Sequence, residues 1–234
     1  MDNTKRINYI LYQLQSGDAV TRNNACDQAL LLISRMTDKT EQNKLRQSIV
    51  LSLIDLGRGD DALSIIQTLR KSEDQNMRIV SYFDWIEYCK KIVHDTIEVE
   101  EAIRQCLAYT RELGVKEATV DAEMEMGKLL INKGEVREAI NNFSDVSLYA
   151  ESNHNRRLLS VSKYYIGYSL YRLGHLIMAE NFIREATEIA YQEKSAYIAK
   201  QSEIMRAIVF MKQGQNNNAS TIFRQWEDNF ALSL

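Results

Sequence analysis

The chain has 234 residues, of which 45% are hydrophobic and 26% are charged, and its formal net charge at pH 7 is −3. Such a composition is that of an ordinary globular protein, and the small net charge gives no general attraction to nucleic acid or to an anionic membrane. No apolar run approaches the roughly 20 residues that a membrane-spanning helix needs, and residues 1–17 lack a signal-peptide pattern. We therefore expect a cytoplasmic protein that neither inserts into a membrane nor binds nucleic acid.

Proline and cysteine usage narrows the fold class. The chain contains no proline, and proline damages helix interiors but is common in the turns of strand-rich folds. Its absence therefore predicts an almost entirely helical chain. The three widely spaced cysteines, Cys26, Cys89 and Cys106, suit buried thiols in a reducing compartment better than disulfides or a zinc site.

In chain order, we expect six helical hairpins, near residues 3–36, 41–72, 76–113, 117–151, 157–193 and 196–230. Short polar stretches such as TDKT, KSEDQ and ESNHN separate them. None of these linkers is long enough to divide the chain into separate domains, so we expect a single repeat domain over residues 1–234.

A period of about 40 residues organises these hairpins. One grid of that period contains Gly17, Gly57, Gly134, Gly174 and Gly214, with Ile97 at the place of a missing glycine. Most grid positions are followed five residues later by an alanine and then by larger apolar residues at helical spacing. Each unit therefore predicts a helix, a turn with glycine in the left-handed conformation, and a second helix that approaches the first closely. Hairpins of this size bury their apolar faces only by stacking on one another.

The sequence resembles the tetratricopeptide repeat (TPR) family over residues 122–146, 163–186 and 208–226. Two glycines match the small residue in the middle of the family's first helix, namely Gly127 and Gly167. The second helix is matched by Ala139 with Phe143 and by Ala179 with Ile183. The resemblance implies an all-α fold, a right-handed α-solenoid of about six helical hairpins. The family's closing proline is absent, and the repeats exceed its usual length of about 34 residues, so this would be a divergent variety.

The resemblance also implies a concave groove lined by the first helix of each hairpin. In the last three hairpins the groove positions are Met124, Lys128, Ile131, Asn132, Tyr164, Tyr168, Tyr171, Arg172, Ile204, Ile208, Met211 and Lys212. The three tyrosines follow the i, i+4, i+7 spacing of one helix face, whereas Tyr165 belongs with the core. Tyrosine and arginine dominate binding hot spots, which favours a partner-binding surface. The alternative is that these side chains pack against the next repeat.

Motifs for catalysis are absent from the sequence. No histidine pair or cysteine pair has the spacing of a metal site, and no glycine-rich phosphate loop occurs. We expect no enzymatic activity, no cofactor and no metal. The favoured function is a non-enzymatic scaffold or adaptor that holds a peptide or helix of another protein in the groove. Two alternatives stay open: a peptide-responsive bacterial regulator, and a TPR interaction module of a larger signalling protein.

The last hairpin ends in an apolar stretch. It places Phe223, Trp226 and Phe230 where a following repeat would normally pack. Because an uncovered apolar face usually marks an interface, this stretch predicts self-association, with a two-fold homodimer as the simplest closed arrangement. A tail that folds back over the face and a further downstream domain are the alternatives.

Overall fold

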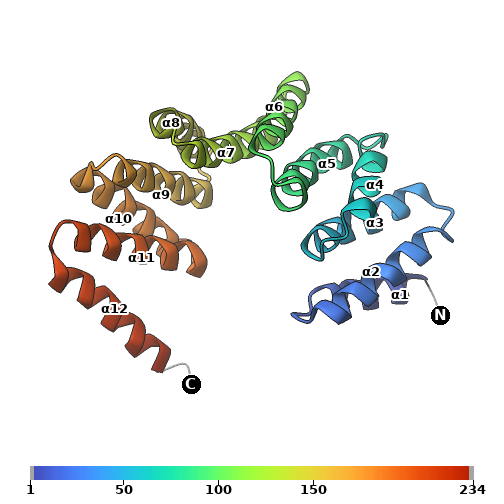
Figure 1. Cartoon of the computed structure of the whole chain (residues 1–234), viewed down its shortest axis with the longest axis horizontal. Coiled ribbons are helices and arrows are strands. Elements are labelled where there is room, and N and C mark those ends of the chain that lie inside the picture. Colours follow the sequence, from blue (N-terminus) through green and yellow to red (C-terminus); the bar gives the residue numbers. More distant parts are fainter. Residues whose placement is uncertain (1–2, 232–234) are drawn as a thin grey trace. The chain divides into compact units, whose positions relative to one another are not determined.

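A computed structural model of the chain describes the backbone of residues 3–231 and the side chains of residues 4–224 (Figure 1). All regular structure in residues 3–231 is helical, which confirms the all-α prediction. The helices are α1 (Asn3–Leu14), α2 (Ala19–Ile33), α3 (Lys39–Asp55), α4 (Gly59–Leu69), α5 (Gln75–Tyr88), α6 (Thr96–Glu112), α7 (Lys116–Lys133), α8 (Val136–Ser152), α9 (Arg156–Arg172), α10 (Leu176–Gln192), α11 (Ala196–Lys212) and α12 (Asn216–Ala231). They pair as the six predicted hairpins, and no predicted end differs from the observed one by more than three residues.

The chain forms two compact units, residues 1–122 and residues 123–234, whose boundary lies inside α7. Within each unit, helices that follow one another in the chain also pack on one another, as α3 does on α4 and α9 does on α10. This sequential packing is what stacked hairpins produce. That the whole chain is one domain remains a prediction.

The turns inside the hairpins confirm four of the five grid glycines. The φ angles of Gly57, Gly134, Gly174 and Gly214 lie between 74° and 84°, in the left-handed region. In the first hairpin, Gly17 has no positive φ, because Asp18 caps α2 through its carboxylate, which accepts hydrogen bonds from the amides of Val20 and Thr21.

The third hairpin departs from the predicted grid. Here α5 continues into a π-helical turn, η1 (Cys89–Val93), and His94 follows in the left-handed conformation with a φ of 57°. Our placement of Ile97 at the turn is therefore wrong, since Ile97 lies within α6 and is 77% exposed. The left-handed turn residue comes 37 residues after Gly57 and not 40, and a histidine takes the place of glycine.

Close helix packing around Gly127 and Gly167 is confirmed. A Cβ atom on Gly127 would lie 2.5 Å from the ring of Phe143, and one on Gly167 would lie 2.5 Å from Cγ1 of Ile183. Both large side chains are fully buried. The absence of a side chain at each glycine thus lets the second helix press its large apolar residue into the first.

The cysteines and the apolar character of the helices also agree with the sequence analysis. All three cysteines are buried and free. Across the described residues, no helix combines the length and the apolar character that crossing a membrane requires.

Candidate functional site

One face of α9 carries the predicted tyrosines. Tyr164, Tyr168 and Tyr171 are each half-buried, and Arg172 beside them is exposed. Burial raises the pKa of Tyr164 to about 12, helped by the neighbouring hydroxyls of Tyr165, Tyr168 and Tyr197. Each of these tyrosines is therefore partly covered by the fold and partly accessible to a partner.

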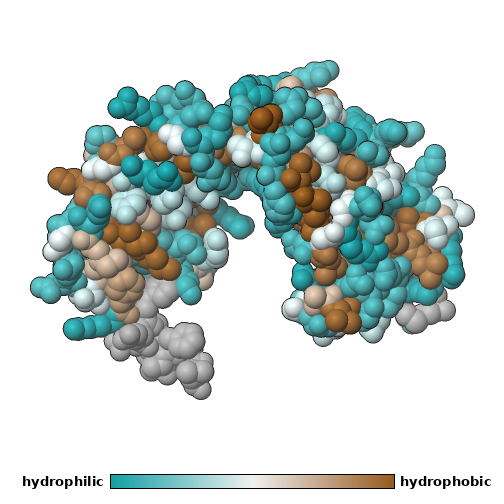
Figure 2. All heavy atoms as spheres, viewed as in Figure 1, coloured by the Kyte–Doolittle hydropathy of each residue, from teal (hydrophilic) through white to brown (hydrophobic). Residues whose placement is uncertain are grey.

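The neighbouring helix α11 repeats this pattern 40 residues later. Ile204 and Ile208 are half-buried, Met211 is 47% exposed, and Lys212 is exposed. Since α9 and α11 contact each other, the two stripes belong to adjacent helices of one unit. Figure 2 shows hydrophobic side chains gathered over the region where α10 and α11 lie. We call the eight predicted residues of α9 and α11 the tyrosine surface: Tyr164, Tyr168, Tyr171, Arg172, Ile204, Ile208, Met211 and Lys212.

Sequence reasoning missed Tyr197, in the first turn of α11. Its side chain is 71% exposed and lies close enough to Tyr164 to affect the pKa of that residue. The repeat pattern assigns no groove position to the first turn of a helix. The only available signal was an aromatic residue at a place where helices usually carry polar ones.

Ion pairs and a hydrogen bond hold α10 in place beside its neighbours. Arg206 of α11 contacts Glu180 of α10 at 2.8 Å, and the hydroxyl of Tyr191 donates to Glu203. On α9, Lys163 contacts Glu185 of α10 at 2.9 Å. These contacts fix the helices that carry the tyrosine surface.

Two basic residues at the end of the surface remain available. Among the described side chains, Arg172 and Lys212 form no ion pair. Each follows its apolar stripe directly in the sequence, so an apolar strip with positive charge at one end runs along each helix.

The four predicted groove positions on α7 differ in how far they are exposed. Met124 and Ile131 are buried, with 5% and 3% of their surface exposed, so our expectation that they face a groove does not hold. Burying such a side chain typically gains about 1.5–3 kcal/mol, and a partner would have to reverse that gain. Lys128 is half-buried and contacts Glu125 at 2.6 Å, with its ammonium 5.7 Å from the centre of the Tyr165 ring. Asn132 is exposed.

Tyr165, which we predicted to belong with the core, is half-buried and contacts the core through its ring. Its ring stacks on that of Phe143 with the two centroids 5.0 Å apart. Because Phe143 is the residue that packs against Gly127, the core contact between α8 and α9 and the close approach of α7 and α8 share one aromatic side chain.

The remaining candidate residues are those predicted for self-association on α12 and the three histidines. Phe223 on α12 is 42% exposed, whereas the side chains of Trp226 and Phe230 lie outside the described residues. His94 and His154 occupy left-handed turns, and His175 precedes α10. Within the part of the chain that the structure describes, no three metal-ligating side chains gather in one place.

Comparison with known proteins gives similarity of structure only. No family model matches the sequence, and no curated protein matches it. Among solved structures, the chain is similar to a STAND signal-transduction ATPase with a TPR sensor from Pyrococcus horikoshii, with a TM-score of 0.76 and 13% identity over 95% of this chain and 35% of that one. The chain therefore spans about a third of that protein's length.

Two further solved structures have similar folds. Aspartyl phosphate phosphatase F from Bacillus subtilis matches with a TM-score of 0.75 and 10% identity, over 95% of this chain and 68% of that one. NprR in complex with its cognate peptide NprX matches with a TM-score of 0.67 and 16% identity, over 97% of this chain and 66% of that one. At these identities the likeness concerns the fold, and it confirms that the chain has a TPR-like helical-repeat fold.

Proposed function

We propose that residues 123–234 bind a peptide segment of another protein on the tyrosine surface, and that the chain acts as a non-enzymatic interaction module in the cytoplasm. The observation that carries this proposal is the stripe of Tyr164, Tyr168 and Tyr171 beside Arg172. Three half-exposed aromatic side chains on one helix face offer large contact area with little conformational entropy to lose. Buried and free cysteines are consistent with a reducing compartment.

The side chains of the tyrosine surface indicate which kind of partner peptide would bind there. The apolar strip on α9 and α11 favours apolar or aromatic anchors in the partner, and Met211 supplies an adaptable contact. Arg172 and Lys212 favour a carboxylate near one end of the segment, which Arg172 can bind through two parallel hydrogen bonds. The expected partner is therefore a short amphipathic segment with apolar anchors and an acidic residue.

A second candidate, the peptide-responsive regulator, is favoured by two comparisons. NprR was solved with its cognate peptide bound, and a Rap protein of similar fold, with a TM-score of 0.55, was solved with Competence and Sporulation Factor. If this chain works in the same way, the bound segment would be a free signalling peptide. In that case binding would change the arrangement of the helices, which scattering with and without peptide would detect.

A peptide-display selection on the immobilised chain tests the proposal. Peptides selected on the wild type are expected to bind at least about tenfold more weakly to Tyr168→Ala and to Arg172→Ala, a loss of about 1.4 kcal/mol. Far-UV circular dichroism should show unchanged helix content in both variants, because both side chains lie at the surface.

Two matched substitutions serve as controls. Tyr12→Ala removes a tyrosine that is 75% exposed on α1, and Arg137→Ala removes an exposed arginine on α8. Both control variants should bind the selected peptides as the wild type does. Peptides that bind all five proteins with equal affinity would show that the tyrosine surface is not the binding site.

A further inference from the structure

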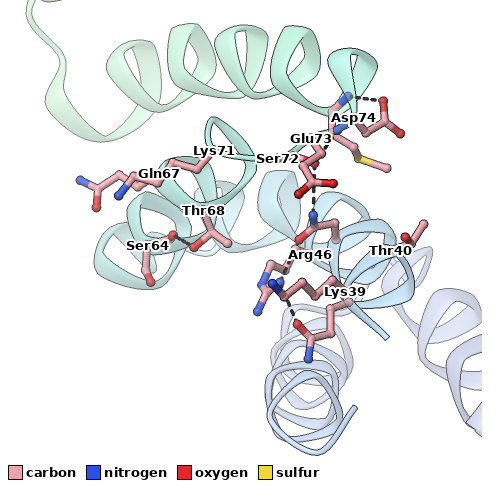
Figure 3. A pocket seen from close by; sticks show the side chains of 13 residues that line it. Lys39, Thr40, Arg46, Ser64, Gln67, Thr68, Lys71, Ser72, Glu73 and Asp74 are labelled. Atoms are coloured by element: carbon pink, nitrogen blue, oxygen red, sulfur yellow. Dashed lines mark hydrogen bonds between the residues drawn. The ribbon is translucent and has the colours of Figure 1, made fainter. Parts of the chain in front are cut away.

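A polar pocket of about 540 Å³ lies in the unit formed by residues 1–122. Figure 3 shows Lys39 and Arg46, from α3, on one side of it and Thr68 and Lys71, from α4 and its end, on the other. The start of α5 closes a third side. The volume falls in the range of about 300–1,000 Å³ typical of small-ligand sites. Its walls, however, consist mainly of basic, hydroxyl and amide side chains, so an apolar ligand would gain little there.

Arg46 is held in a fixed orientation in this pocket. Its Nη1 donates hydrogen bonds to Oδ1 of Asn43 at 2.9 Å and to Oε1 of Gln42 at 3.4 Å. Asn43 in turn donates to Oγ of Ser72 at 3.3 Å, and Gln42 donates to the carbonyl oxygen of Met36 at 2.6 Å. The network ties the guanidinium of α3 to the connection between α4 and α5 before any ligand arrives.

The charge of Arg46 has no acidic partner among the described residues. Only neutral amide oxygens accept its hydrogen bonds, and burial lowers the pKa of its guanidinium without any carboxylate to oppose that effect. Arg58 in the same unit shows the usual arrangement, with contacts of 2.6 Å to both Asp27 and Asp61. Arg70, another half-buried arginine of this unit to which the described residues give no carboxylate partner, stacks on the rings of Tyr82 and Trp85, whereas Arg46 lines an open pocket.

Two lysines and two acidic residues supply the other charges of the pocket, so that basic side chains outnumber acidic ones by three to two. Lys39 and Lys71 are exposed at its rim and form no ion pair among the described residues. Oδ1 of Asp74 accepts hydrogen bonds from the backbone amides of Asn76 at 2.8 Å and Met77 at 3.4 Å at the start of α5, which holds this carboxylate at the helix start. Glu73 is exposed and forms no ion pair with Arg46, so its carboxylate is an internal competitor for the arginine.

We propose that this pocket binds the oxyanion of a small ligand, a phosphate group or a carboxylate, through the guanidinium of Arg46 with Lys39 and Lys71 at the rim. The Nε and Nη2 donors of Arg46 have no partner among the described residues, and these two donors form the fork that pairs with two oxygens of such an anion. The lysines supply charge without fixed geometry. The pocket lies within residues 39–77, so it is independent of the tyrosine surface.

Calorimetric titration of the full chain tests this proposal with inorganic phosphate, O-phosphoserine and citrate, at constant ionic strength. At least one anion should bind saturably with millimolar or better affinity. Binding of the two phosphate compounds assigns a phosphoryl ligand, and binding of citrate alone assigns a carboxylate. Absence of saturable binding for all three anions would overturn the proposal.

Four variants locate the site. Arg46→Gln should weaken binding at least about tenfold, the loss expected for a charged hydrogen-bonding pair, and Lys71→Gln should weaken it by a smaller factor. Glu73→Gln should tighten binding, because the internal competitor is removed. Arg35→Gln removes an equal charge from an exposed site outside the pocket and should leave affinity unchanged. Equal losses in Arg46→Gln, Lys71→Gln and Arg35→Gln would show unspecific charge attraction and refute the site. Lys71 and Glu73 are exposed, so their variants keep the test decisive if Arg46→Gln fails to fold.

Discussion

Replacing Gly167 with alanine should destabilise residues 123–234, although alanine is intrinsically the better helix former by about 1 kcal/mol. The new Cβ would lie 2.5 Å from Cγ1 of Ile183 and 3.1 Å from both the carbonyl oxygen of Ala179 and the amide nitrogen of Ile183. Carbon atoms pack at about 3.5–4.0 Å, so α9 and α10 would have to separate by about 1 Å. Two of the three obstructing atoms belong to the backbone, which cannot rotate away as the tip of a side chain can.

The expected size of the effect follows from these two opposing contributions. Overpacking of a close-packed core costs about 1–3 kcal/mol, and the gain in helix propensity offsets about 1 kcal/mol of it. Because two of the obstructing atoms belong to the backbone, the overpacking cost should lie in the upper part of its range, and we expect a net loss of about 1–2 kcal/mol. For a chain of this size, each kcal/mol lowers the melting temperature by about 2–4 °C. Thermal and urea unfolding followed by far-UV circular dichroism measure the change.

Two other glycines provide the controls. A Cβ on Gly17 would meet no atom within 4 Å, and its φ is not positive, so Gly17→Ala should be neutral or stabilising by about 0.4–1 kcal/mol. Gly174 is equally open but has a φ of 83°, so Gly174→Ala should cost about 1–2 kcal/mol through backbone strain alone. A Gly167→Ala variant that is as stable as the wild type, or more stable, would refute the close-packing argument.

Three further changes have defined expected outcomes. Burial, with repulsion from Glu87, raises the pKa of Asp84 from 3.8 to about 7. A raised acid pKa means that the contribution of Asp84 to stability is most favourable below pH 4 and is lost as the pH rises to about 7, by on the order of 4 kcal/mol in all. Asp84→Asn should therefore be more stable than the wild type at pH 8 and nearly equal to it at pH 4; urea unfolding that gives the same difference at both values would contradict this. His94→Gly should stabilise the chain by about 0.5–1 kcal/mol in thermal unfolding, because a left-handed φ strains histidine but not glycine, and a destabilised variant would count against it. For the proposed self-association through α12, where Phe223 is exposed, sedimentation should show a wild-type dimer that Trp226→Glu converts to monomer, and a monomeric wild type at high micromolar concentration would exclude the dimer.

The sequence by itself determined the helices and their pairing into hairpins. A recurring glycine fixes where most hairpins turn, because few other residues adopt a left-handed φ without strain. The spacing of Gly167 from Ala179 and Ile183 fixes how two helices of one hairpin touch. These are local relations within about 20 residues of chain, so they can be read from sequence separation alone.

Only the tertiary structure decided which helix faces stay open. The pattern that correctly left Tyr168 and Met211 accessible assigned Met124 and Ile131 to the same kind of surface, yet both are buried. The turn at His94 and the pocket around Arg46 were likewise invisible in the repeat pattern. The exposure of a residue depends on which distant helices cover it. Likewise, the lack of an ion pair at Arg46 depends on where the acidic side chains lie after folding. The spacing of residues in the sequence shows which side chains share a helix face, whereas only the packing of the folded chain determines which residues contact that face.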